Sequence, residues 1–296
     1  MYKKYGLRKR YYSSVSASDF EGLEEEVNTY DLKNSREALA SSEKFQQLDK
    51  KIQQELLSWS DDGYVVLKNY FSSDEVASFN EKIDELLASK KVKFENGNKI
   101  MFAIHKSKLL FQIGAHKKII SILETLLDKE VTLFQSINFL TGSQQGAHSD
   151  SISMSTFPKG NLIAIWVALE DIDAESGPLY YYKGSHKLPY FMNKDYDNEG
   201  STFFLGNKGY DAYLKNIQNL LDDNKLEKKH FLAKKGDVLI WHANLVHGGE
   251  KVLDDNKTRK SMVFHYYAKD AVAFHEITQR PTLKENFEGL FDSIKE

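Results

Sequence analysis

The sequence predicts a mainly β protein, an antiparallel sandwich or barrel, that follows a helical N-terminal part. From about residue 130 onward, apolar and aromatic runs of strand length succeed one another with Gly and Pro between them. Most of these runs have no helical segment between them, which argues against alternating β–α–β units. At roughly 150 residues per domain, 296 residues allow two domains, but one β core with a helical extension also reaches this length.

Residues 1 to about 62 are polar and favour helix. The stretch 42–59 carries its apolar residues at helical spacing and predicts one amphipathic helix. The chain starts with a basic run that no apolar segment follows, so we expect a solvated arm and not a secretory signal. The basic residues are Lys3, Lys4, Arg8, Lys9 and Arg10.

A strand and further helices come next. β-branched and aromatic residues predict a strand over 63–71. Ser72 and Glu75 then fit a capping box, which places the start of a helix at this point. The pattern over 107–128 is helical again.

Five apolar or aromatic runs in the rest of the chain are predicted to be strands. They cover residues 130–142, 162–172, 178–186, 236–242 and 259–269. A polar stretch over 190–209 and a predicted helix over 210–226 interrupt them. Because such long excursions from a β-domain are often functional, we expect a lid-like insertion around 190–226. The expected organisation is an N-terminal arm and helical extension over 1–60 and a single domain over 61–296.

The composition narrows the classes of function. The chain has nine His and no Cys, which excludes disulfides, thiolate metal sites and thiol nucleophiles and leaves nitrogen and oxygen ligands for a metal. Its 40 basic and 43 acidic residues give a net charge of −3, which argues against a nucleic-acid partner. The longest apolar stretch, 162–169, is far shorter than the roughly 20 residues of a membrane span. We therefore expect a cytoplasmic protein without a membrane span.

Three residues have the spacing of a metal site. His148 and Asp150 are two residues apart, so an extended chain points both at one face. His247 follows 97 residues after Asp150, just beyond a predicted strand. Two His and one carboxylate form the facial triad of non-haem iron(II) oxygenases, which leaves coordination positions open for a co-substrate and O2. His242 is the competing distal ligand, although its place at the end of an apolar strand favours packing.

A basic residue follows the triad. Arg259 comes twelve residues after His247, and on a strand it shares a face with Ser261. A guanidinium there can hold a carboxylate with two hydrogen bonds, which suits the distal carboxylate of 2-oxoglutarate. The alternative is a surface Arg in a basic turn beside Lys257 and Lys260.

Other polar residues are weaker candidates. Gln135 and Asn138 interrupt an otherwise apolar strand, and a buried amide needs a partner, either the co-substrate or the backbone. The remaining His residues have no partner in sequence and are expected to be structural. They are His105, His116, His186, His230, His265 and His275.

Taken together, the motifs resemble the phytanoyl-CoA dioxygenase (PhyH) family of iron(II)- and 2-oxoglutarate-dependent oxygenases. The resemblance covers roughly residues 60–270. It rests on DGYVVLKNYFSSDEV, on HSD, on LIAIWVALEDIDAESGPLYYYKGSHKLP, and on GDVLIWHANLVHGG followed by Arg259. The resemblance implies a double-stranded β-helix (jelly-roll, cupin-like) core wrapped by N-terminal helices.

The same resemblance implies roles for individual residues. The implied iron(II) ligands are His148, Asp150 and His247. Arg259 is implied as the clamp of 2-oxoglutarate, and Trp166 as a residue beside this co-substrate. With O2 as the other co-substrate, the implied products are succinate, CO2 and an oxidised substrate.

The chain departs from the family pattern at two positions. Two residues after the distal His the family often has Ser, and here Gly249 stands, so Ser261 is the candidate for the missing hydrogen bond. Ser149 stands inside the HxD motif, where Gln is frequent. Related halogenases have a small residue in place of the carboxylate, so the presence of Asp150 indicates a hydroxylase or a desaturase.

We therefore predict an oxygenase that hydroxylates an unactivated C–H bond of a small metabolite or biosynthetic intermediate. The insertion carries charges of both signs and selects no substrate, and no pattern in the sequence indicates the oligomeric state. One alternative is a non-catalytic jelly-roll binding protein, which would release no succinate. A metal-dependent cupin isomerase or epimerase is the other, and it would work without O2.

Overall fold

Antiparallel strands dominate the chain after residue 130, as the apolar runs predict. The computed structural model describes residues 2–10, 12–24, 26–28, 30, 35–95, 97–200 and 204–282. Its strands are β1 Tyr64–Leu67, β2 Phe94–Glu95, β3 Lys99–Met101, β4 Val131–Phe139, β5 Ser155–Phe157, β6 Leu162–Ala168, β7 Leu179–Tyr182, β8 Lys228–Phe231, β9 Val238–His242, β10 His247–Gly249, β11 Ser261–Ala268, β12 Val272–His275 and β13 Arg280–Pro281.

These strands form one large and two small sheets. The large sheet has seven strands in the order β1-β9-β6-β11-β4-β3-β2, and every pairing in it is antiparallel. The small sheets have the orders β10-β7-β8 and β13-β12-β5. The long apolar run 162–172 forms β6 near the centre of the large sheet, where all seven residues of the strand are buried.

The N-terminal helices are shorter than the periodicity predicts. They are α1 Ser35–Ser41, α2 Glu43–Gln46, α3 Lys50–Leu56, α4 Trp59–Asp62, α5 Ser73–Ala88, α6 Lys108–Gly114 and α7 Lys117–Leu127. The single helix predicted over 42–59 is three short ones, because new helices begin directly after Asp49 and Ser58, inside the apolar pattern. The segment 107–128 is likewise divided at His116, which precedes α7.

The capping box at the start of α5 is present as predicted. Ser72 Oγ accepts a hydrogen bond from the Glu75 backbone N–H, and the Glu75 carboxylate accepts one from the Ser72 N–H at 2.8 Å. These two bonds satisfy donors that the first helical turn would otherwise leave unpaired. The predicted strand over 63–71 ends earlier than expected, at Leu67, because the chain turns at Asn69, whose φ is 50°.

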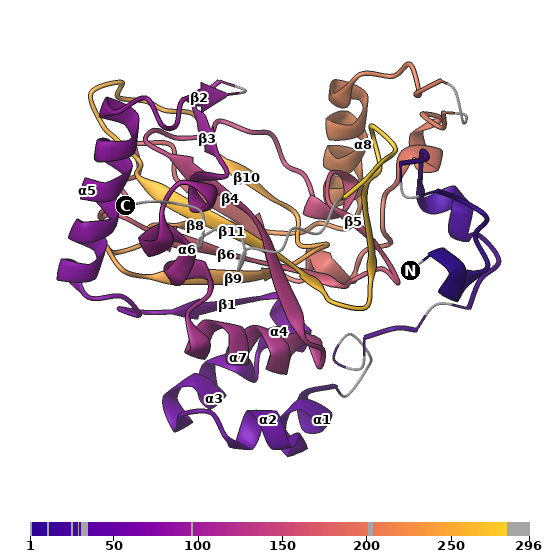
Figure 1. Cartoon of the computed structure of the whole chain (residues 1–296), viewed down its shortest axis with the longest axis horizontal. Coiled ribbons are helices and arrows are strands. Elements are labelled where there is room, and N and C mark those ends of the chain that lie inside the picture. Colours follow the sequence, from indigo (N-terminus) through magenta and orange to yellow (C-terminus); the bar gives the residue numbers. More distant parts are fainter. Residues whose placement is uncertain are drawn as a thin grey trace.

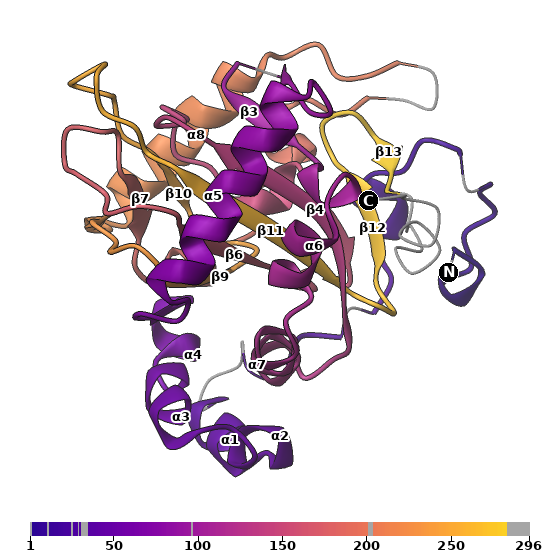
Figure 2. The ribbon, with the colours of Figure 1, turned by 60° about the vertical axis from the view of Figure 1, so that its left-hand side comes forward.

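Helices cover one face of the large sheet, and a small sheet covers the other. Figure 2 shows α5 and α6 in front of the large sheet, with α7 beside them and α1 to α4 below. Apolar side chains of α4 to α7 pack with those of β1, β6, β9 and β11 in the largest buried cluster. On the opposite face, Trp166 and Trp241 of the large sheet pack with Leu179 and Tyr181 of β7. The functional site lies within this second layer.

The basic N-terminal residues are largely exposed, as expected of a solvated arm, but the segment that carries them also packs on a small sheet. Figure 1 shows the N-terminal segment lying beside β5 and β12. Val15 and Phe20 pack against Phe157, Val272 and Phe274, and Phe20 stacks on Phe157 at 4.3 Å between ring centroids. Tyr5 and Leu7, which lie among the basic residues, pack against the same cluster, so apolar contacts anchor this segment to a small sheet.

The insertion after β7 contains one long helix, α8, over Tyr210–Asp223, close to the predicted 210–226. A short 3-10 helix, η7 Asn193–Tyr196, precedes it. Tyr213, Ile217 and Leu221 of α8 are buried against Tyr180 and other apolar residues on the outer side of β7. In the described part of the chain, no helix combines the length and apolar character needed to cross a membrane.

Candidate iron and 2-oxoglutarate site

The backbone brings the two His of the predicted triad together. His148 and His247 form an isolated antiparallel bridge, in which each backbone N–H donates to the other residue's carbonyl oxygen at 2.9 Å. Ser149 is extended, with φ −99° and ψ 149°, and Asp150 begins the 3-10 helix η5 Asp150–Ile152. The extended step from His148 to Asp150 therefore turns both side chains to one point, as the HxD spacing predicts.

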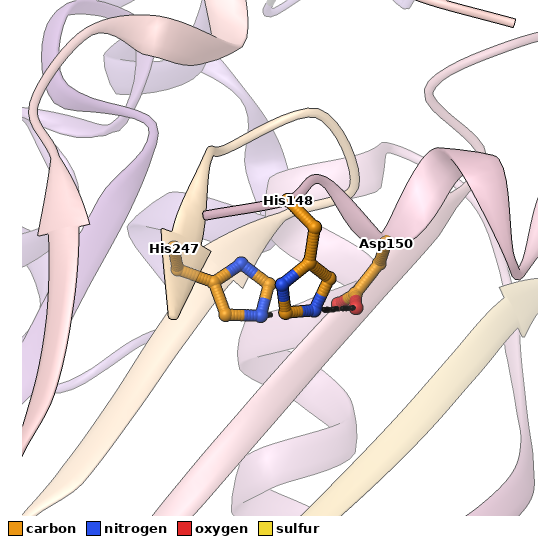
Figure 3. A group of neighbouring side chains, drawn as sticks. All are labelled: His148, Asp150 and His247. Atoms are coloured by element: carbon orange, nitrogen blue, oxygen red, sulfur yellow. Dashed lines mark ion pairs between the residues drawn. The ribbon is translucent and has the colours of Figure 1, made fainter. Parts of the chain in front are cut away.

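The three side chains converge on a volume the size of one ion. Figure 3 shows the two imidazole rings next to each other, tilted by 48°, with the Asp150 carboxylate beside them. Asp150 Oδ1 lies 3.9 Å from His148 Nε2 and 3.8 Å from His247 Nε2. One ligand atom from each residue lies within 4.8 Å of the others, and all three residues are buried. This donor set, two imidazoles and one carboxylate, fits a divalent transition metal.

Hydrogen bonds to the backbone fix the orientation of both imidazoles. His148 Nδ1 lies 2.8 Å from the Gly146 carbonyl oxygen, and His247 Nδ1 lies 3.0 Å from that of Leu245. Because a carbonyl oxygen only accepts, each Nδ1 carries the hydrogen and each Nε2 presents its lone pair to the centre of the triad. Metal-binding His residues in proteins are usually held in this way.

The charges at the triad also suit a cation. Burial, together with the nearby His247, lowers the pKa of His148 to about 3, so its ring is neutral and can act as a ligand. Burial by itself would raise the pKa of Asp150, but the neighbouring His247, His265 and His148 lower it overall, so the carboxylate stays charged. The site therefore offers the neutral ring of His148 and the negative charge of Asp150, with His247 Nε2 beside them.

A cavity of about 260 Å³ opens beside the triad. Residues of the large sheet form one wall, and β7, β10 and the segment before His148 contribute to the others. The lining residues include Lys99, Met101, Gln135, Ile137, Phe139, Ser143, Gln145, Met154, Trp166, Leu179, Trp241, Arg259, Val263, His265 and His275. Three of the predicted co-substrate contacts, Arg259, Trp166 and Gln135, are therefore on the wall of the same cavity as the triad.

Arg259 is the most deeply buried charge in this wall. It is 2% exposed, and its Nη1 donates to Ser261 Oγ at 2.7 Å. Its guanidinium lies 5.1 Å from the ring centre of Phe139 and 5.8 Å from that of Trp166. Among the residues that the structure describes, none accepts a hydrogen bond from its Nε. Burial lowers the pKa of Arg259 to about 10, which leaves the group charged at neutral pH.

The other two predicted co-substrate contacts, Ser261 and Asn138, do not line the cavity. Ser261 is fully buried and reaches Arg259 rather than the cavity wall. Gln135, Ile137 and Phe139 alternate along β4 and line the cavity, so the alternation of a strand turns Asn138 to the other face. The structure therefore does not bring Asn138 to this cavity, although its amide is buried and has no partner among the described residues.

The structure also explains the glycine after the distal His. A Cβ atom on Gly249 would overlap the hydroxyl oxygen of Ser143, which lines the cavity. The hydroxyl of Ser143 therefore occupies the space that a side chain at position 249 would need.

Sequence analysis missed three cavity residues, Trp241, His265 and Lys99. Trp241 Nε1 donates to Asp150 Oδ2 at 2.7 Å, and His265 Nε2 lies 3.6 Å from the same oxygen. Lys99 of β3 lies 3.4 Å from Gln145 Oε1, and burial lowers its pKa. A period of two from Ser261 through Val263 to His265 is the pattern that marks His265 as facing inward.

His242 does not compete for the metal. It follows Trp241 in β9 and therefore faces the helices, where its ring lies 5.9 Å from Trp59 and 5.5 Å from His186. Its Nδ1 accepts a hydrogen bond from the Asn244 N–H at 3.0 Å. The packing role predicted from its place in an apolar strand is confirmed.

Solved structures with the same fold include iron- and 2-oxoglutarate-dependent enzymes. The carbocyclase SnoK of nogalamycin biosynthesis is 18% identical, with a TM-score of 0.62 over 81% of this chain and 96% of that one. The epimerase SnoN of the same biosynthesis is 21% identical, with a TM-score of 0.60 over 75% of this chain and 85% of that one. EctD from S. alaskensis is 21% identical, with a TM-score of 0.55 over 73% of this chain and 76% of that one. These similarities confirm the predicted cupin-like fold with its jelly-roll core.

Fold and sequence together define a non-haem iron(II)- and 2-oxoglutarate-dependent dioxygenase. The family model of phytanoyl-CoA dioxygenase (PhyH) matches residues 59–261, so the chain belongs to this family. The phytanoyl-CoA dioxygenase domain-containing protein 1 of Bos taurus is 24% identical over 71% of this chain and 88% of its own length. An ectoine dioxygenase of Stutzerimonas stutzeri is 31% identical over 43% of this chain and 47% of its own length. The enzyme uses iron(II), 2-oxoglutarate and O2.

Proposed function

We propose that this enzyme hydroxylates an unactivated C–H bond of a small metabolite or biosynthetic intermediate. The observation that carries the proposal is the convergence of a buried triad and a buried Arg259 on one cavity of about 260 Å³. A triad without Arg259 would fit any cupin metalloenzyme. The additional buried cation makes the cavity suitable for a dicarboxylate whose other end reaches the metal.

The residues divide into two groups in this proposal. His148, Asp150 and His247 hold the iron(II). Arg259, oriented by Ser261, holds the distal carboxylate of 2-oxoglutarate. When bound, the iron and 2-oxoglutarate supply the oxidising chemistry, in which O2 is activated and succinate and CO2 are released.

The protein supplies position, charge and exclusion of water. The aromatic rings of Phe139 and Trp166 shield Arg259 from solvent, which strengthens its attraction for a carboxylate. The two backbone carbonyl oxygens that hold His148 and His247 keep both rings in one orientation. A substrate carbon is then held at a fixed place relative to the metal, which is the main contribution a protein makes to this type of reaction.

The size and lining of the cavity support a compact substrate. Its volume of about 260 Å³ lies below the ~300–1,000 Å³ that is usual for ligand pockets, and the co-substrate must share it. In addition to the triad, thioether, hydroxyl and imidazole groups line the cavity. They belong to Met101, Met154, Ser153 and His275. Such a lining suits a small molecule with both polar and apolar parts.

We also propose that the enzyme is located in the cytoplasm.

An anaerobic titration tests the metal and co-substrate site. Addition of Fe(II) and then 2-oxoglutarate to the wild type should produce a visible charge-transfer band. The band should be lost in His148→Ala and kept in His230→Ala, which changes a half-exposed His outside the cavity. A wild type without a band, or a His148→Ala variant with a full band, would refute the proposed site.

A metabolite screen for substrate-stimulated succinate release tests the reaction. Hydroxylation predicts a product heavier by one oxygen atom for each succinate formed. A product lighter by two hydrogen atoms would indicate desaturation and would overturn the proposed outcome. Turnover without O2 would instead favour an isomerase, and ligand binding without succinate release would favour a binding protein.

A further inference from the structure

The two oxygens of the Asp150 carboxylate have different surroundings. Oδ1 faces the triad, 3.9 Å from His148 Nε2 and 3.8 Å from His247 Nε2. Oδ2 accepts the hydrogen bond from Trp241 Nε1 at 2.7 Å and lies 3.6 Å from His265 Nε2. One oxygen is therefore directed at the metal position, and the other accepts a hydrogen bond from Trp241, with the imidazole of His265 as a second, more distant donor group.

The sheet register places both donors around this oxygen. Trp241 of β9 and His265 of β11 are each paired with Ala164 of the intervening strand β6. Directly paired residues of antiparallel strands project from the same face, so a short side chain stands between two long ones. The Asp150 carboxylate contacts the two long side chains.

Packing fixes the direction of the Trp241 donor. The indole and His265 are each only 2% exposed. The indole ring lies 4.9 Å from the ring centre of His247 and 6.3 Å from that of His265, almost perpendicular to the latter. Buried between these two rings, the indole directs its N–H at Asp150 Oδ2.

We propose that Trp241 and His265 are positioning residues that keep Asp150 a one-oxygen ligand of the metal. A carboxylate can bind a cation with one oxygen or with both. By occupying Oδ2, the two donors prevent the second mode, which would use a coordination position that the co-substrate or O2 requires. This inference rests on the proposed metal site and adds two residues that act through Asp150.

Binding of Co(II), measured without turnover, tests the inference. We expect Trp241→Phe to weaken Co(II) binding by about 10- to 100-fold, the usual effect of losing a partner of a metal ligand. The visible spectrum of the bound Co(II) should also change, because a second carboxylate oxygen would enter the coordination sphere. Trp59→Phe is the matched control: it shortens another buried indole, which packs against His242 on the helix side, and should leave affinity and spectrum unchanged.

A second pair of variants keeps the test independent of the folding of Trp241→Phe. His265→Gln retains an amide N–H near Oδ2, whereas His265→Leu has no donor. We expect the Gln variant to keep a nearly wild-type Co(II) spectrum and the Leu variant to lose it. Equal affinities and spectra for wild type, Trp241→Phe and His265→Leu would overturn the inference. Absence of Co(II) binding in the wild type would refute the proposed metal site instead.

Discussion

At the scale of single residues, Arg259 is a buried cation with few polar partners. Among the described residues, no carboxylate forms an ion pair with it, and its contacts are one hydroxyl and two aromatic rings. Burying a cation with so few partners costs free energy that a bound carboxylate would offset. The unfavourable burial of Arg259 is therefore consistent with a co-substrate site and not with a structural ion pair.

Replacement of Arg259 by Lys should weaken 2-oxoglutarate binding by about 30-fold, or about 2 kcal/mol, although the charge is kept. A Lys side chain offers a point charge and cannot make the two parallel hydrogen bonds of a guanidinium. Titration of the Co(II)-loaded protein with 2-oxoglutarate measures this loss. Co(II) binding by the variant serves as the control, since Arg259 is not a ligand. Unchanged 2-oxoglutarate affinity would contradict the assigned role.

The residues of the triad are predictable from sequence because their geometry is local or carried by a short motif. The HxD spacing is enough to bring His148 and Asp150 to one face. His265 and Trp241 are not predictable in this way, since they reach Asp150 only through the register of β9, β6 and β11. Asn138 shows the same limit, because one step along β4 moves a side chain from the cavity to the opposite face.

At the scale of elements, α8 supports the metal-binding segment. Tyr213 is fully buried, and its hydroxyl oxygen accepts a hydrogen bond from the Ser149 N–H at 3.1 Å. Ser149 stands between two of the triad residues, and Leu214 of the same helix packs over Gly146. The helix predicted as part of a lid is therefore attached to the HxD segment and positions it.

Tyr213→Phe should reduce the free energy of unfolding by about 1–3 kcal/mol, because the buried Ser149 N–H would lose its acceptor. Urea denaturation of the metal-free protein measures this loss. Ser149→Ala is the matched control: it removes a hydroxyl but keeps the N–H bonded to Tyr213, so a much smaller change is expected. Equal stability of Tyr213→Phe and the wild type would show that α8 does not support this segment.

The lengths of the elements are less predictable than their types. The apolar spacing over 42–59 continues through two helix starts, because Asp49 and Ser58 interrupt the backbone without interrupting the apolar face. The strand β6 is predicted well because its run of apolar residues is buried on both faces of the sheet. Apolar spacing therefore does not predict where the helices begin and end, whereas burial predicts where the strands lie.

At the scale of the whole molecule, Glu276 joins three segments that are distant in the sequence. Its carboxylate accepts hydrogen bonds from the Ala17 N–H at 2.8 Å and from the Asn193 N–H at 3.4 Å. The first belongs to the N-terminal segment and the second to the insertion. Glu276 follows His275 of β12, which lines the cavity. The N-terminal segment, whose charge alone predicts a solvated arm, is thus connected to the wall of the active site.

This connection predicts a pH dependence of stability with a definite sign. Burial, together with the nearby Glu199 and Asp19, raises the pKa of Glu276 to about 7 despite the two backbone donors, which lower it. The folded protein therefore binds this proton more tightly than the unfolded chain does. The stabilisation is complete below the carboxyl's ordinary pKa, near 4.5, and is lost as the pH rises through about 7.

Glu276→Gln should remove this part of the pH dependence, because the amide stays neutral and its oxygen can still accept from Ala17. The free energy of unfolding of the variant, relative to wild type, should rise by on the order of 2 kcal/mol between pH 5 and pH 8, in proportion to the raised pKa. Denaturant titrations across this range measure the difference. Glu276→Ala should also lose the pH dependence but be less stable at every pH, since it lacks an acceptor. Parallel curves for wild type and Glu276→Gln would show that this carboxyl does not titrate between the two states, and the connection would then be structural only.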